Sequence, residues 1–156
     1  MKNIRRLEQI LEEVKQKFPM AKKKRIKIKL RNLKYDYMNL EQKGREYIFN
    51  IDEKTIVPVK NRQILRGIFA HELAHIENDS TLRGAAINWD IRSDKDSSVY
   101  RGYVESCADM TAIVHGFGRE LYLVKVNRRV GKEHKRYKRE EGLTIAQTKK
   151  LVFNRN

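Results

Sequence analysis

Two of the chain's four histidines, His71 and His75, lie four residues apart in the segment His71-Glu72-Leu73-Ala74-His75. Residues with this spacing share one face of an α-helix, so both imidazoles could bind a single Zn²⁺ ion. Glu72 would lie about 100° further round the helix, where its carboxylate could reach a zinc-bound water. Zinc lowers the pKa of such a water towards neutrality, and the carboxylate can accept its proton. The segment therefore predicts two metal ligands and a general base, Glu72.

The alternative is a chance match, with two ordinary histidines on an ordinary helix, because the H-E-x-x-H pattern fixes only three residues. Ile68, Phe69 and Leu73 give this helix an apolar face. A buried metal site needs such surroundings, which favours the metal interpretation.

A catalytic zinc needs a third protein ligand and an open fourth position. The candidates in this sequence are Glu77, Asp79, Glu105, Asp109, His115 and His134. Glu105 is favoured, because apolar residues flank it in a predicted helix, where an unpartnered carboxylate is unusual. Asp109 follows four residues later on the same face and could accept the second N–H of a ligating histidine. His115 is the rival third ligand, although a continuous helix would turn it away from Glu105.

Hydrophobic spacing predicts the elements that would position these residues. An amphipathic helix over residues 3–18 ends at Pro19, and strands follow at 25–33, 35–40 and 46–51. Residues 57–59 are extended and could add a fourth strand. Helices are expected over 62–77, from about residue 97 to a break at Gly116 and Gly118, over 119–129 and over 143–153. This order predicts an α+β fold, with helices packed on one face of a three-stranded or four-stranded sheet.

The chain carries a formal net charge of +15, and its two ends are basic. Residues 1–35 hold 13 basic and 3 acidic side chains, residues 36–100 hold 9 and 11, and residues 101–156 hold 13 and 6. Basic ends are compatible with nucleic-acid binding, but a solvated surface is favoured, because basic runs are common and no aromatic residues interrupt the run over residues 22–31. A single cysteine excludes an internal disulfide, and no apolar run is long enough for a signal peptide or a membrane span. We expect a cytoplasmic protein with no membrane partner.

His71-Glu72-x-x-His75, Glu105 on a second helix and Asp109 four residues later resemble the gluzincin metallopeptidases, and most of all the minigluzincins. The resemblance implies one Zn²⁺ per chain held by His71, His75 and Glu105. It also implies a peptide or protein substrate hydrolysed with the help of Glu72, and a supporting role for Asp109. Gluzincins bind substrate along an edge strand, for which residues 47–51 are the counterpart, with Tyr47 and Phe49 as candidate contacts; an ordinary core strand is the alternative. No tyrosine or histidine is clearly placed to stabilise an oxyanion.

The resemblance covers roughly residues 46–118, and we expect one zincin-like domain over residues 1–130 followed by a basic tail over residues 131–156. Some minigluzincins are latent, with a C-terminal segment in the cleft, so this tail could inhibit the enzyme or form a homodimer by exchange. Truncation near Gly131 would then raise activity, whereas a merely solvated tail would leave it unchanged. The pattern around Glu105 is also similar to the ImmA/IrrE family, whose members cleave transcriptional repressors. A zinc-binding protein without catalysis is the third interpretation.

Overall fold

The computed structural model describes residues 2–33, 37–79, 98–127 and 142–154. Its regular elements are α1 (Lys2–Lys15), a 3₁₀ turn (Ala21–Lys23), β1 (Arg25–Arg31), β2 (Met38–Lys43), β3 (Glu46–Asp52), α2 (Glu53–Ile56), α3 (Arg62–Asp79), α5 (Ser98–Ala112), a π-helical turn (Ile113–Phe117), α6 (Gly118–Val126) and α8 (Ile145–Phe153). The predicted α+β fold is confirmed. Within the described ranges, no helix combines the length and the apolar character that crossing a membrane requires.

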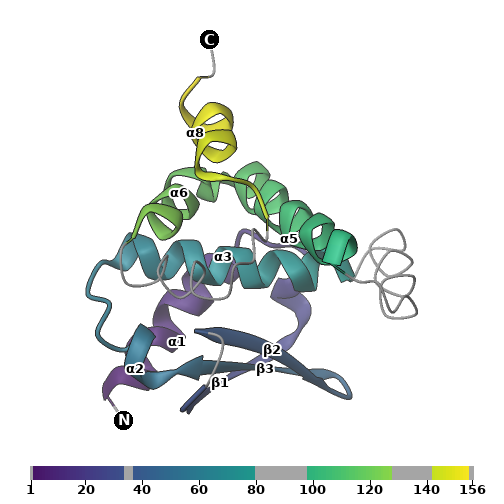
Figure 1. Ribbon diagram of the computed structural model, residues 1–156. Coiled ribbons are helices and arrows are strands. Elements are labelled where there is room, and N and C mark those ends of the chain that lie inside the picture. The colour runs from purple at the N-terminus through teal and green to yellow at the C-terminus, as the bar shows by residue number, and fades with distance from the viewer. Residues whose placement is uncertain (1, 34–36, 80–97, 128–141, 155–156) are drawn as a thin grey trace.

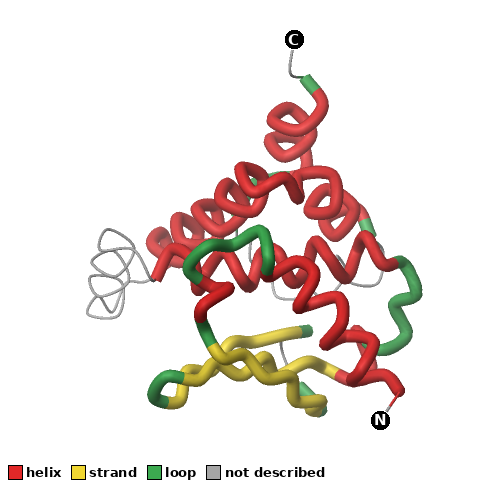
Figure 2. The backbone as a smooth tube through the Cα atoms, turned by 180° about the vertical axis from the view of Figure 1, so that it is seen from behind, coloured by secondary structure: helices red, strands yellow, loops and turns green. Residues whose placement is uncertain are grey.

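The three strands form one sheet in the order β1-β3-β2, and the helices gather on one of its faces (Figures 1 and 2). The central strand β3 pairs in parallel with β1 and antiparallel with β2. Residues 57–59 do not join the sheet, because residues 53–56 form the short helix α2 directly after β3. Asp52 begins that helix by accepting a hydrogen bond from the backbone N–H of Thr55. The three-stranded form of the prediction is therefore the one observed.

The edge strand β1 has the alternation that its sequence predicts. Ile28 is buried in the core, whereas Arg25 and Lys27 are exposed and form ion pairs with Glu46 of β3. Charged side chains along an edge strand discourage pairing with another chain. Part of the positive charge of the N-terminal region thus lies on exposed side chains of the sheet.

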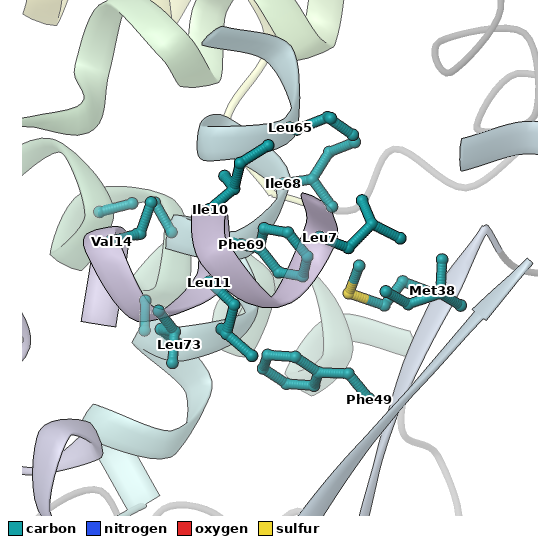
Figure 3. Close-up of a cluster of buried hydrophobic side chains, with 14 of the residues drawn as sticks. Leu7, Ile10, Leu11, Val14, Met38, Phe49, Leu65, Ile68, Phe69 and Leu73 are labelled. Carbon is teal, nitrogen blue, oxygen red and sulfur yellow. The ribbon is translucent and has the colours of Figure 1, made fainter. Parts of the chain in front are cut away.

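Helix α3 lies at the centre of the molecule. On one side, Phe69 and Leu73 pack among the apolar side chains of α1 and the sheet, where the ring of Phe49 stacks on that of Phe69 at 6.1 Å between centroids (Figure 3). On the other side, α3 lies along α5 and α6 (Figure 1). Since α3 is packed on both sides, the position of each residue along it is fixed by the whole core.

A close approach of α6 to α3 depends on Gly67. A Cβ atom there would lie 2.5 Å from the backbone oxygen of Glu120 and 2.7 Å from a methyl group of Val124. Alanine normally stabilises a helix by up to about 1 kcal/mol over glycine, but overpacking against backbone costs about 1–3 kcal/mol or more. We therefore expect Gly67→Ala to lower the free energy of unfolding by about 1–3 kcal/mol, measured by chemical denaturation.

The matched control is Gly102→Ala in α5, where no described atom lies within 4 Å of the added Cβ. This substitution should leave stability unchanged or raise it by up to about 1 kcal/mol. Equal effects of the two substitutions would contradict the tight packing of α3 against α6.

Candidate metal centre

Two neighbouring helices bring three potential ligands together. His71 and His75 lie one turn apart on α3, and Glu105 extends from α5, which packs alongside. The Nε2 atom of His71 lies 2.9 Å from Oε2 of Glu105 and 3.2 Å from Nε2 of His75. Nε2 of His75 lies 3.4 Å from Oε1 of Glu105. These three side chains could together hold a metal ion.

The spacing of these donor atoms fits a small ion in tetrahedral coordination. Bonds of about 2.1 Å at tetrahedral angles place neighbouring donors about 3.4 Å apart. The two Nε2 atoms lie 3.2 Å apart, and the two oxygens of Glu105 lie at similar distances, Oε2 at 2.9 Å from His71 and Oε1 at 3.4 Å from His75. One donor atom from each of the three residues lies within 4.8 Å of the other two. Two imidazole nitrogens and one carboxylate oxygen also form a donor set that zinc accepts, and they leave a fourth position for water or substrate.

The fully buried Asp109 orients His71 from the opposite side of the ring. Its Oδ1 atom lies 2.8 Å from Nδ1 of His71, while Nε2 of the same ring faces Glu105. The structure thus places Asp109 where the helical spacing of four residues from Glu105 predicts it. A carboxylate on Nδ1 keeps the proton there and leaves Nε2 free for a metal ion.

In the absence of metal, His71 lies between two carboxylates. Burial by itself lowers the pKa of His71, but the hydrogen bonds to Asp109 and Glu105 and the charges of both groups outweigh it and raise the pKa well above the ordinary value. Burial raises the pKa of Glu105 and of Asp109, but the contacts with His71 outweigh it and hold both below their usual range. Each of these groups therefore favours the charged form of its partner.

These opposite shifts predict how the stability of the metal-free protein depends on pH. The raised pKa of His71 stabilises the fold fully below about pH 6.5, and this contribution is lost as the pH rises through the folded-state pKa. The lowered pKa values of Glu105 and Asp109 stabilise it above about pH 4.5, and that contribution is lost on acidification. Metal binding requires an unprotonated Nε2, so it releases a proton and becomes tighter at higher pH.

We expect the melting temperature of the metal-free protein to be highest near pH 5–6 and to fall as the pH rises above about 6.5. The rise in melting temperature on adding zinc should grow over the same interval. Thermal unfolding with a chelator or with zinc, at a series of pH values, measures both trends. The His71→Gln variant is the control, because it lacks the titrating ring. A zinc-induced shift that stays constant with pH in the unsubstituted protein would contradict the proton release.

Glu72 is buried in the same turn of α3 as His71. It is not among the residues whose donor atoms form the triangle. This placement agrees with the expectation that Glu72 does not ligate the ion alongside the two histidines.

Two of the remaining candidate ligands, His115 and Glu77, have other partners. His115 lies in the π-helical turn, and its ring packs on Phe18 at 4.6 Å between centroids. Glu77 accepts hydrogen bonds from the backbone N–H groups of Met20 and Ala21 and so holds the 3₁₀ turn. His134 lies outside the described residues. Among the described residues, Glu105 is the carboxylate grouped with the two histidines.

The expectation that residues 47–51 form an edge strand is wrong. They belong to β3, which is paired on both sides, by β1 and by β2. Tyr47 and Phe49 are both buried, and Phe49 is part of the core. An extended peptide adds to a sheet only through unpaired backbone groups, which β3 does not offer. Of the strands described, only β1 and β2 lie at an edge.

Sequence reasoning missed the groups that surround the other oxygen of Asp109. The Nζ atom of Lys125 in α6 and the backbone N–H of Leu143 each donate to Oδ2 at 2.8 Å. They lie 16 and 34 residues from Asp109 in the sequence. No local pattern connects them to the H-E-x-x-H segment, so the sequence holds no signal for this contact.

The site thus consists of two histidines and a glutamate from two helices, with an aspartate on the far side of the first histidine ring. Comparisons of the chain with known protein families, with curated proteins and with solved structures find no match.

Proposed function

We propose that the protein is a zinc-dependent metallopeptidase that hydrolyses peptide bonds within its substrates. The observation that carries the proposal is the convergence of His71, His75 and Glu105, which each offer one donor atom within 4.8 Å of the other two, close enough to share one ion. Three protein ligands with an open fourth position are typical of catalytic zinc, whereas structural zinc sites have four. The resemblance to the gluzincins, in the H-E-x-x-H pattern and the separate glutamate helix, supports the same assignment.

A zinc ion held by these residues would polarise the scissile carbonyl group and make a water molecule acidic enough to react near neutral pH. The carboxylate of Glu72 takes the proton of that water as the water attacks the carbonyl carbon. It then passes the proton to the amine that leaves when the peptide bond breaks. Glu72 is therefore an unprotonated carboxylate again when the reaction is complete.

The other residues of the site hold these groups in place. Asp109 accepts from Nδ1 of His71 and so keeps Nε2 available, where it would hold the ion. The negative charge of Glu105 offsets part of the charge of the ion and moderates its acidity. Packing of α3 against both the sheet and α5 keeps the two helices in register.

The experiment is to remove metal with a chelator, restore one equivalent of zinc per chain, and incubate the protein with an unfolded protein substrate. Mass spectrometry of the products identifies new peptide ends. We expect cleavage with zinc, loss of cleavage with chelator and recovery when zinc is returned. Tight zinc binding without cleavage of any substrate would instead favour a non-catalytic zinc protein. Absence of zinc binding would show that the H-E-x-x-H match is coincidental.

A further inference from the structure

The buried carboxylate of Asp109 has partners on three different segments of the chain. Oδ1 faces Nδ1 of His71 on α3, while Oδ2 accepts from Lys125 of α6 and from the backbone N–H of Leu143. Leu143 belongs to the C-terminal segment, residues 142–154, which passes beside α5 before it enters α8 (Figure 1). Two donors on one oxygen restrict rotation of the carboxylate and keep the other oxygen directed at His71.

The path of this segment requires Gly142. Its φ angle is +86°, a left-handed conformation that other residues rarely adopt. A Cβ atom there would lie 2.5 Å from Oδ2 of Asp109 and 3.5 Å from the backbone oxygen of Glu105. The backbone at Gly142 therefore lies against the turn of α5 that carries both Glu105 and Asp109, at a distance only glycine permits.

Helix α8 holds the segment in this position. Thr144 and Gln147 form a reciprocal capping box that fixes the backbone directly after Leu143. The ring of Phe153 meets that of Tyr122 edge to face at 5.2 Å. Val152 packs against Gly118, where an added Cβ would lie 2.7 Å from its methyl group. Contacts between α8 and α6 thus determine where the N–H of Leu143 points.

We propose that the C-terminal segment helps to build the metal centre. Together with Lys125 it positions Asp109, and Asp109 in turn sets the orientation of His71 and the affinity of the site for metal. The segment contacts Asp109, which lies on the Nδ1 side of His71, whereas the ion would bind on the Nε2 side. This inference rests on metal binding by the proposed site and opposes the expectation of an inhibitory tail. Detachment of the segment weakens metal binding rather than opening the site.

Gly142→Ala is the sharpest test, with Gly44→Ala as its matched control. Both glycines have positive φ angles, so both substitutions strain the backbone, but no described atom lies within 4 Å of a Cβ at Gly44. We expect Gly142→Ala to weaken zinc binding about tenfold, as is usual when the partner of a ligating histidine is disturbed, and Gly44→Ala to leave it unchanged. Competition with a chromophoric chelator measures both affinities in the full-length chain.

Lys125→Met tests the second donor, with Lys149→Met on the exposed face of α8 as its control. Lys125→Met should weaken zinc binding to a similar extent, and Lys125→Arg, which retains a positively charged donor, should recover part of the loss. The absorption spectrum of bound Co²⁺ should shift in Gly142→Ala and Lys125→Met but in neither control. A purely structural role would lower the melting temperature and leave the spectrum and the affinity of the folded protein unchanged.

Wild-type zinc affinity in both folded Gly142→Ala and folded Lys125→Met would overturn the inference. So would a chain ending at residue 127 that stays folded and keeps its zinc affinity. These measurements require only metal binding, so absence of peptide hydrolysis would overturn the proposed function and leave this inference standing. In the metal-free protein, the ring ¹⁵N signals of His71 should also change in Gly142→Ala and not in Gly44→Ala. Unchanged signals would count against the inference even if zinc did not bind.

Discussion

Glu105→Gln is expected to weaken zinc binding by more than about 100-fold, because disturbing an outer partner of a ligand already costs about 10–100-fold. Glutamine preserves the shape of the side chain but replaces an anionic ligand by a neutral amide, which binds zinc poorly. His71 and His75 would remain as two neutral ligands, too few for a stable site. The zinc content after dialysis should fall from about one per chain to near zero, and competition with a chelator gives the change in affinity.

Glu120→Gln is the matched control for this substitution. Glu120 is also a partly buried glutamate on a neighbouring helix, but it pairs with Arg66 rather than with a histidine. Its substitution should alter stability slightly and leave zinc content unchanged. If Glu105→Gln retained wild-type affinity, the third ligand would have to come from another part of the chain. The proposal that α5 supplies a metal ligand would then be wrong.

Glu72→Gln is expected to lower the rate of peptide hydrolysis by about 10²–10⁴-fold, the usual contribution of a general base, while zinc remains bound. Glutamine has nearly the same size and can still form hydrogen bonds, but its amide cannot accept a proton from water at neutral pH. The measurement is kcat/KM on a peptide that the unsubstituted enzyme cleaves, with zinc content determined on the same sample.

The separation of these two readouts makes the result decisive. Retained zinc and lost activity would assign the proton transfer to Glu72. Loss of zinc together with activity would show that Glu72 supports the fold of the site instead, since this side chain is buried in α3. Full activity in Glu72→Gln would mean that another residue is the general base. Glu120→Gln is again the control and should show that a Glu→Gln substitution by itself has little effect on activity.

Much of the secondary structure could be predicted, because helices and strands impose short repeats on the sequence. Helix α3 spans Arg62–Asp79 where residues 62–77 were expected, and β3 spans Glu46–Asp52 where residues 46–51 were expected. The break after α5 also falls at the predicted glycine, since Gly116 has a φ angle of +93° that ends regular helix. Spacing of four residues likewise predicted that Glu105 and Asp109 share one face of α5 and that Asp109 reaches a ligating histidine, which is His71 in the structure.

The order of the strands could not be predicted in the same way. Residues 46–51 are mostly apolar, with Tyr47, Ile48 and Phe49 in succession, and such a short run predicts a strand without showing which other strands pair with it. Pairing with β1 and β2 decides that Tyr47 and Phe49 belong to the core rather than to a substrate-binding edge. Residues 25–31 and 46–52 become neighbours only when the chain folds back on itself.

The sequence by itself determined the two histidines and Glu72 on one helix, Glu105 and Asp109 on another, and the chemistry that these residue types allow. Only the tertiary structure decided that the two helices pack with three donor atoms in one triangle, and that His115 lies outside it. It alone placed Lys125 and Gly142 against Asp109. The physical reason is the difference in sequence separation. Helical periodicity relates residues about four positions apart. The charge of a buried carboxylate is compensated by any donors that folding brings near it, and these can be far away in the sequence.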